Sequence, residues 1–286
     1  MQLAERNKDG SFSTQAARRD VLAQAGKQLL GAGFRNLGAE GLKPKHVQKL
    51  LEVWKSDGLG VATIKNRVAH LRWWSEKVGK QNVIPASNDA LGLGRRSFVT
   101  NVSKAASLPV DRLSDIKEER LRVSLELQAA FGLRREECLK FQPVKALNGS
   151  EPGDAVAIHL AASWCKGGRA RSVPIRTEQQ REVLNRALAL AGSGSMIPTD
   201  RTYVGWLGVY EQQTRRVGLK KMHGLRHDYA QKLYEQLTGW LSPACGGPRS
   251  KDLSIEQKTI DLNARLQVSE ELGHGRESIT SVYLGR

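Results

Sequence analysis

The segment LGHGRESITSVYLGR, residues 272–286, places His274 and Tyr283 nine residues apart. The end of a chain is usually where order fades, unless something ties it down. This segment is therefore either an ordinary amphipathic end or one whose tyrosine hydroxyl is used in chemistry. Motifs elsewhere in the sequence decide between these two interpretations.

Cationic side chains recur in two helical patterns upstream of this segment. In KMHGLRHDYAQKL, residues 221–233, His223 and Arg226 are one helical turn apart and so share a face. In FGLRREECLKF, residues 131–141, Arg134 follows a glycine near a predicted helix terminus. Each pattern is a weak signal by itself, because a basic protein produces such pairs by chance. The set as a whole carries the information.

A β-hairpin is predicted between these two motifs. The β-type runs AVAIHLAAS (residues 155–163) and ARSVPI (residues 170–175) are joined through WCKGGR, whose glycine pair favours a tight turn. Lys166 lies in that turn. Elsewhere the periodicity is helical, so the predicted fold is mainly α with a small β-hairpin or sheet.

A cluster of these side chains would need an anion at its centre. Two guanidinium groups, two imidazoles and an ammonium repel one another unless a negative charge lies between them, and arginine forks match phosphate oxygens in particular. A tyrosine hydroxyl is a weak acid, so it becomes a nucleophile only beside positive charge or a base. The set predicts phosphoryl transfer through a covalent phosphotyrosine.

The composition favours a polyanionic partner. The 286 residues include 45 Lys plus Arg and 29 Asp plus Glu, a formal net charge of +16. We interpret this excess as a signal for nucleic acid, with a basic surface that binds no such partner as the alternative. Cys138, Cys165 and Cys245 are too widely spaced to indicate a disulfide framework or a zinc site. Without an apolar run long enough for a membrane span, or a secretory signal, a cytoplasmic location is expected.

Two domains joined by a linker are predicted. Three helical segments near the N-terminus predict a small bundle, and they cover residues 14–33, 43–58 and 61–80. A stretch rich in Pro, Gly and Ser follows, and a helical pattern resumes at residue 113. The predicted division is a helical DNA-binding domain at 1–85, a linker at 86–112 and a catalytic domain at 113–286.

Basic residues of the N-terminal half are candidates for DNA contact. Lys65 and Arg72 lie seven residues apart in the third helical segment and share a face, with Arg67 nearby. Arg95 and Arg96 add a pair of charges in the predicted linker. A charged face that is merely solvated is the alternative interpretation.

Taken in order, GLRREE, WCKGGRARSVPI, HGLRHDYA and LGHGRESITSVY resemble the catalytic motifs of the tyrosine recombinases, the phage integrase family. The resemblance covers residues 113–286, is highly specific as a set, and points to integrases of proteobacterial prophages and integrative elements in particular. The helical half before it is similar in kind to the family's core-binding domain. The resemblance implies a site-specific recombinase that cleaves and rejoins DNA through a 3′-phosphotyrosyl intermediate, to integrate or excise a mobile element.

The resemblance also assigns the chemical steps to residues of this chain. It makes Tyr283 the nucleophile, His223 the acceptor of its proton, and Lys166 the general acid that protonates the departing 5′-oxygen. Arg169 and Arg171 on the same hairpin are the alternatives to Lys166.

The remaining motif residues would hold the phosphate. The resemblance implies that Arg134 and Arg226 bind its non-bridging oxygens and that His274 hydrogen-bonds a phosphate oxygen. Glu137 matches an acidic position that supports the site. Arg135 replaces Arg134 if the motif is shifted by one residue.

The resemblance implies double-stranded DNA attachment sites as partners and a homotetramer when two sites are synapsed. It also implies accessory DNA-bending or directionality proteins and an association with the nucleoid. No cofactor and no metal are expected; His227, four residues after His223, suggests a zinc alternative that lacks the glutamate of the metalloprotease pattern. A type IB topoisomerase and a non-catalytic DNA-binding protein derived from an integrase are the functional alternatives.

One segment is longer than the resemblance leads us to expect. The interval between Arg226 and His274 is expanded, and the excess lies within residues 237–266. A Gly-Gly-Pro sequence near its centre predicts a loop. Downstream of that sequence, Ser254 and Gln257 have the spacing of a capping box, as do Thr177 and Gln180 earlier in the chain, and both pairs predict helix starts.

Overall fold

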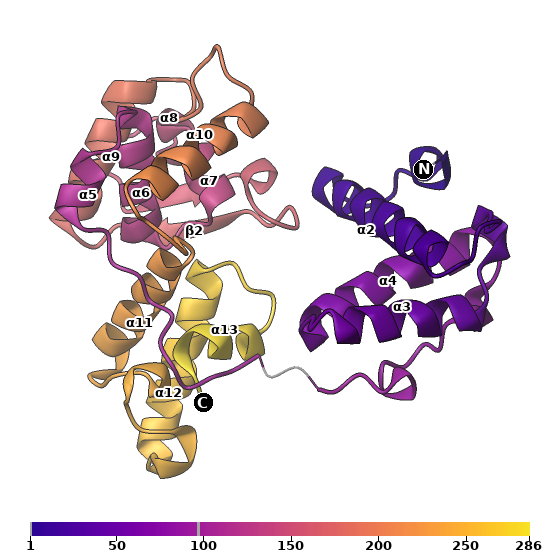
Figure 1. The fold of residues 1–286 in the computed structure, drawn as a ribbon. Coiled ribbons are helices and arrows are strands. Elements are labelled where there is room, and N and C mark those ends of the chain that lie inside the picture. The colour runs from indigo at the N-terminus through magenta and orange to yellow at the C-terminus, as the bar shows by residue number, and fades with distance from the viewer. Residues whose placement is uncertain (1, 96–97) are drawn as a thin grey trace. The chain divides into compact units, whose positions relative to one another are not determined.

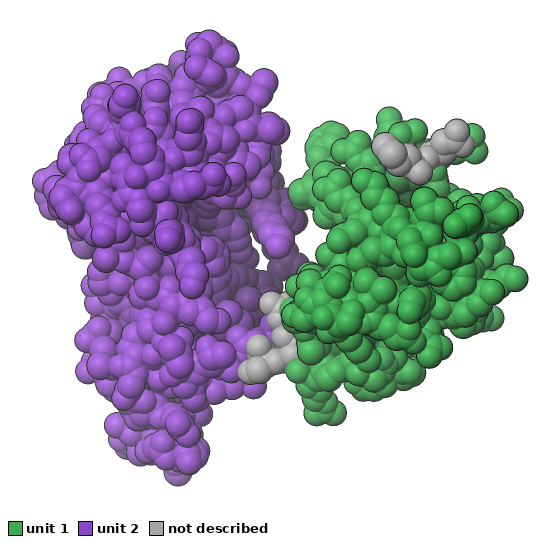
Figure 2. Space-filling model, viewed as in Figure 1, with its two compact units in different colours: residues 1–97 green, residues 98–286 purple. Residues whose placement is uncertain are grey.

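The computed structural model describes residues 2–95 and 98–286, and the chain forms two compact units, Met1–Ser97 and Phe98–Arg286 (Figure 1, Figure 2). The described residues are mostly helical and include a two-stranded antiparallel sheet, which confirms the predicted fold class. The boundary between the units falls inside the predicted linker. The functional division at 1–85, 86–112 and 113–286 stays a prediction.

The N-terminal unit is built from helices whose apolar faces meet in one core. Its helices are α1 (Gln2–Arg6), α2 (Phe12–Gly31), α3 (Pro44–Ser56) and α4 (Val61–Lys77). The last three correspond to the three predicted helical segments, while α1 was not predicted. On α4, Ile64, Val68 and Leu71 are buried at helical spacing, as their pattern indicated.

The C-terminal unit, residues 98–286, is built around α6, which packs against α9 and α11. Its described helices are α5 (Val110–Ser114), α6 (Glu119–Phe131), α7 (Arg135–Leu139), α8 (Pro143–Ala146), α9 (Glu178–Ala191), α10 (Tyr203–Arg216), α11 (Gly224–Thr238), α12 (Ile255–Glu271) and α13 (Glu277–Leu284). α6 ends at Gly132, whose φ of +60° closes the helix in the left-handed region that glycine tolerates. This turn leads directly to Arg134.

The predicted hairpin is present. Strand β1 (Ala157–Leu160) pairs antiparallel with β2 (Arg171–Pro174), and the last residue of β1, Leu160, lies opposite Arg171. The connecting turn contains Gly167 and Gly168, both with positive φ, as the sequence indicated. The turn carries Lys166 away from the sheet, while the strands anchor it to the core through Ile158 and Val173.

The expanded segment is a loop in its first half and a helix in its second half. After α11 the chain makes two short 3₁₀ turns, η5 (Pro243–Cys245) and η6 (Ser250–Asp252). The capping box of Ser254 and Gln257 then starts α12, and that of Thr177 and Gln180 starts α9, as predicted. The prediction of a loop therefore holds only up to Ser254, because α12 occupies the rest of the segment.

The start and the end of the C-terminal unit are hydrogen-bonded to each other. The side-chain amide of Asn101 donates to the carbonyl of Arg286 at 3.0 Å, and its oxygen accepts from the Arg286 amide at 2.8 Å. Ser103 donates to Gln231, which in turn donates to the carbonyl of Tyr283 at 2.9 Å. These contacts tie down the segment that carries Tyr283.

Among the helices of the described residues, none combines the length and the apolar character that crossing a membrane requires.

Candidate active site

Tyr283 lies on α13 with its hydroxyl group directed at two residues of α11 and the turn before it. The Tyr283 oxygen is 3.2 Å from Nε2 of His223 and accepts a hydrogen bond from Nε of Arg226 at 3.4 Å. The side chain is almost fully buried, with 7% of the residue exposed. The phenol oxygen thus has a possible proton acceptor and a cation beside it.

Arg226 joins three segments of the site from a fully buried position. Its Nη1 donates to the carbonyl of Gly132 at 2.6 Å, and its Nη2 donates to the carbonyl of Leu272. Nη2 also lies 3.3 Å from Nε2 of His274. Burial, and then the charge of Arg134, lower the pKa of Arg226 to about 10, so it stays a cation at neutral pH.

Glu137 holds Arg134 in place. Its carboxylate is fully buried and accepts from Arg134 twice, from Nη1 and from the backbone N–H, both at 2.7 Å. It also accepts two hydrogen bonds from Arg171. Burial would raise the pKa of this carboxyl, but the hydrogen bonds and charge of Arg171 and the charges of Arg226 and Arg134 lower it to about 2. The group is therefore a fixed anion.

The surroundings of the two predicted catalytic histidines lower their pKa values and so favour their uncharged forms. Burial, and then the charge of Arg226, lower the pKa of His274 to about 3 and lower the pKa of His223. Because an arginine only donates, Nε2 of His274 is the acceptor beside Arg226, and Nδ1 carries the proton toward Thr280 Oγ1, 3.2 Å away. A neutral His223 is able to take a proton from Tyr283.

His227 is a residue of this site whose position the sequence did not reveal. Its ring centroid lies 4.4 Å from that of Tyr283, and the ring of His274 stacks on the same tyrosine at 5.2 Å. Burial, and then the charge of His223, lower the pKa of His227 to about 4. The four-residue spacing from His223 that suggested zinc instead brings His227 against the tyrosine. Within residues 2–95 and 98–286 no three His, Cys, Asp or Glu side chains gather in a way that could hold a metal.

Lys166 is exposed in the turn of the hairpin. Its charge is near enough to help lower the pKa of His223, after burial and the charges of Arg226 and Arg134. Of the alternatives to Lys166, Arg169 is exposed in the same turn, whereas the guanidinium group of Arg171 is buried against Glu137. Arg135, the alternative to Arg134, instead pairs with Glu211 at 2.8 Å on the surface.

The structure places the candidate DNA contacts of the N-terminal unit in different surroundings. Lys65 is partly exposed on α4, and the guanidinium group of Arg67 lies 5.3 Å over the ring of Trp54. Arg72 is occupied by hydrogen bonds to the carbonyl of Pro85 and to Asn88. Of the two candidates in the predicted linker, Arg95 is exposed, and Arg96 lies outside the described residues.

Two family models match consecutive parts of the chain. The model described as "Phage integrase, N-terminal" matches residues 1–84, and the model described as "Integrase" matches residues 94–232. No curated protein matches the chain in sequence.

Solved structures show the fold. The Tn1549 transposon integrase in complex with circular intermediate DNA has a TM-score of 0.59 at 14% identity, over 100% of this chain and 94% of that one. A lambda integrase dimer bound to a COC′ core site has a TM-score of 0.59 at 15% identity, over 98% of this chain and 92% of that one. A lambda integrase tetramer bound to a Holliday junction has a TM-score of 0.54 at 16% identity, over 100% of this chain and 76% of that one.

Proposed function

We propose that the chain is a site-specific DNA recombinase, an integrase of the tyrosine recombinase kind, and that Tyr283 is the nucleophile that becomes joined to DNA. The observation that carries the proposal is the position of its hydroxyl group, within hydrogen-bonding distance of both His223 Nε2 and Arg226 Nε. A base and a cation at one phenol oxygen are what a tyrosine needs to attack phosphorus.

In the proposed cleavage step, the Tyr283 oxygen bonds to the scissile phosphorus as the bond between phosphorus and the 5′-oxygen breaks. His223 accepts the phenol proton, and Lys166 gives a proton to the departing 5′-oxygen. The products are a 3′-phosphotyrosine and a free 5′-hydroxyl. The new ester retains the energy of the phosphodiester, so a 5′-hydroxyl of another strand rejoins the DNA without an external energy source.

The cations of the site stabilise the charge that develops on the phosphate. Arg134 and Arg226 are proposed to bind the non-bridging oxygens, and both are held before DNA arrives, Arg134 by Glu137 and Arg226 by buried carbonyls. A phosphate beside His274 favours its protonated form, which then donates a hydrogen bond from Nε2 to a phosphate oxygen.

We further propose double-stranded attachment sites as the substrate and a homotetramer as the synaptic assembly. Support comes from the similar solved structures, which include an integrase in complex with circular intermediate DNA and an integrase tetramer bound to a Holliday junction. A proteobacterial prophage or integrative element is the proposed source of the DNA ends. Accessory DNA-bending or directionality proteins, and an association with the nucleoid, complete the proposal.

A trapped covalent adduct tests the nucleophile. Nicked duplexes that carry the ends of the element encoding the chain lose the short 5′-hydroxyl fragment after cleavage, so the protein stays on the DNA. We expect an adduct with the natural chain and none with Tyr283→Phe, as measured by denaturing electrophoresis. Tyr203→Phe, on the partly buried face of α10, is the matched control and should retain the adduct. An adduct with Tyr283→Phe would refute the assignment.

A second readout separates recombination from DNA relaxation. A topoisomerase of similar chemistry relaxes any supercoiled plasmid, whereas a recombinase joins two defined sites on separate molecules. We expect joining that depends on both sites. A non-catalytic DNA-binding protein would form no adduct at all.

A further inference from the structure

Arg171 is a buried arginine that the cleavage mechanism above does not use. It is the first residue of β2, at the point where the hairpin turn returns to the sheet. Its side chain is only 5% exposed, while Lys166 and Arg169 in the same turn are exposed. A cation in this position needs partners inside the protein.

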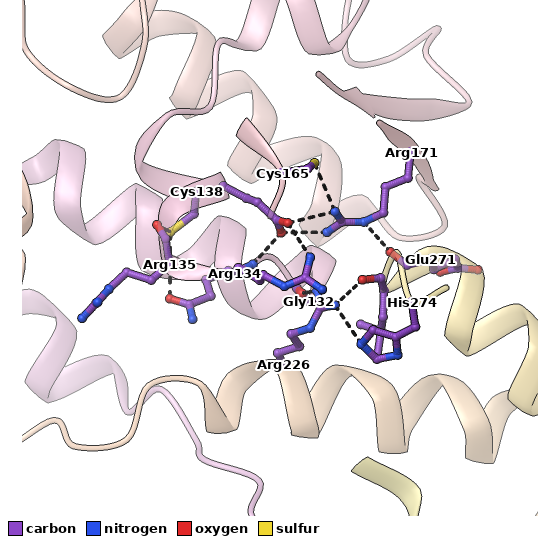
Figure 3. Close-up of polar contacts among 12 residues, drawn as sticks. Gly132, Arg134, Arg135, Cys138, Cys165, Arg171, Arg226, Glu271 and His274 are labelled. Carbon is purple, nitrogen blue, oxygen red and sulfur yellow. Dashed lines mark hydrogen bonds and ion pairs between the residues drawn. The ribbon is translucent and has the colours of Figure 1, made fainter. Parts of the chain in front are cut away.

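Each side of the Arg171 guanidinium group has a partner (Figure 3). Nη1 and Nη2 form a fork on the carboxylate of Glu137, at 2.9 and 2.7 Å. Nε donates to the carbonyl of Glu271 at 2.8 Å, and Nη1 also donates to Sγ of Cys165 at 3.3 Å. With these bonds made, little donor capacity remains for a phosphate, so Arg171 is not itself a phosphate-binding group.

The partners of Arg171 belong to three segments of the proposed active site. Glu137 positions Arg134, and Cys165 directly precedes Lys166. Glu271 ends α12 immediately before the turn that leads to His274. One guanidinium group therefore links the hairpin turn to both sides of the phosphate site.

The turn before His274 is packed directly on the stem of Arg171. A Cβ added at Gly273 would lie 2.8 Å from Cδ of Arg171, so only a glycine allows this close approach. The φ of Gly273 is +64°, which glycine adopts without strain. Arg171 is thus held from both sides, by packing as well as by its hydrogen bonds.

From this geometry we infer that Arg171 is a positioning residue for the general acid: it anchors the hairpin turn so that Lys166 is presented to the departing 5′-oxygen. The inference rests on the proposed function. Lys166 is exposed in a turn of ten residues between the strands, so the position of its ammonium depends on how firmly that turn is anchored. Arg171 is the buried anchor at the β2 end of that turn.

A lysine cannot replace the arginine in this role. Its single ammonium can pair with Glu137 but cannot form the fork and also reach the carbonyl of Glu271. Arg171→Lys therefore keeps the buried charge paired while it loosens the anchor. Arg186→Lys makes the same chemical change at an exposed arginine of α9, which pairs with Glu126 away from the site, and is the matched control.

The test compares cleavage of two DNA substrates under single-turnover conditions. One is the nicked duplex described above, and the other has sulfur in place of the bridging 5′-oxygen at the scissile phosphate. A thiol with a pKa of about 8.5 leaves without being protonated, so the sulfur substrate needs no general acid. Lys166→Ala should slow cleavage of the normal substrate by about a hundredfold or more. The same variant should cleave the sulfur substrate near the natural rate.

Arg171→Lys should show the same pattern at a smaller scale. We expect cleavage of the normal substrate to slow by about ten- to a hundredfold, as for a catalytic group misplaced by about 1 Å, with the rate restored on the sulfur substrate. Arg186→Lys should cleave both substrates at the natural rate. Equal slowing of both substrates by Arg171→Lys, or no slowing of either, would overturn the inference.

The outcome is separable from that of the proposed function. If the natural chain forms no adduct, both fall; if it forms the adduct and sulfur fails to restore Arg171→Lys, only this inference falls. Should Arg171→Lys fail to fold, as judged by circular dichroism, Cys165→Ala decides the matter. It removes the contact between the guanidinium group and the turn and leaves the ion pair with Glu137 intact. A smaller slowing that sulfur restores supports the inference, and an unchanged rate refutes it.

Discussion

Tyr283 differs from neighbouring tyrosines in what surrounds its hydroxyl group. Tyr229 and Tyr234 both donate to buried carboxylates, and burial together with those carboxylates raises the pKa of each. The pKa of Tyr234 rises to about 12. Tyr283 instead faces His223 and Arg226, a base and a cation. At the scale of single residues, this contrast distinguishes the proposed nucleophile from the tyrosines that bond to carboxylates.

The lowered pKa of His227 predicts a loss of stability in acid. Between pH 6.5 and about 4 the imidazole takes up a proton in the unfolded chain but not in the folded one, so the free energy of unfolding falls as the pH falls. The largest slope is about 1.4 kcal/mol per pH unit for one such group. Urea unfolding measured from pH 7 to pH 5 checks the slope.

His227→Phe provides the control for this prediction. It keeps a ring against Tyr283 but cannot be protonated, so the slope in this pH range should become smaller. An unchanged slope would show that His227 is already protonated in the folded protein or neutral in both states.

The sequence singled out the proposed catalytic positions because each lies in a short motif, and the motifs occur in a fixed order. Arg171 was noted there only as an alternative to Lys166. Its ion pair with Glu137 connects residues far apart in the sequence, so no local pattern announces it. The contact between His227 and Tyr283 likewise depends on how α13 packs against α11.

At the scale of elements, the end of α6 is a tightly constrained helix terminus of the site. An added Cβ at Gly132 would lie 2.5 Å from the ring of Tyr229, and φ is positive there. The carbonyl of Gly132 also accepts a hydrogen bond from Arg226. Helix geometry, packing and the active site thus meet at one residue.

Gly132→Ala should therefore lower the free energy of unfolding by more than the backbone strain alone. Gly239 ends α11 with a φ of +84° and nothing near its Cβ position, so Gly239→Ala measures the left-handed strain alone, about 1 to 2 kcal/mol. We expect Gly132→Ala to exceed that loss and also to slow cleavage, because Arg226 shifts with the carbonyl. Thermal unfolding and adduct formation test the pair, and equal losses would contradict this view.

Elements with a local signal were predicted, and those set by packing were not. The hairpin followed from its glycine pair and β-type runs, and the starts of α9 and α12 followed from their capping boxes. The segment 98–106 was predicted to be linker because it lacks periodicity, yet Asn101 and Ser103 bond it to the rest of the C-terminal unit. Such side-chain bonds leave no periodic trace in the sequence.

At the scale of the whole molecule, the charge of +16 predicts DNA binding that weakens steeply with salt. Lys65→Ala should lower the slope of log Kd against log salt by about one, if Lys65 contacts a phosphate.

Arg72→Ala should instead destabilise the N-terminal unit by about 2 kcal/mol, because its guanidinium group donates hydrogen bonds to Pro85 and Asn88. Fluorescence anisotropy and urea unfolding separate the two effects, and a reversed pattern would contradict them.

The paired hydrogen bonds between Asn101 and Arg286 have a consequence for the connectivity of the C-terminal unit. A short peptide that joins the two ends would close its backbone into a ring, which can be opened at another surface turn. The exposed turn at Asn148 and Gly149, where φ is positive, interrupts no helix or strand. A circular permutant opened there would carry Tyr283 in the interior of its sequence, so the order of the motifs along the chain is separable from their arrangement in space.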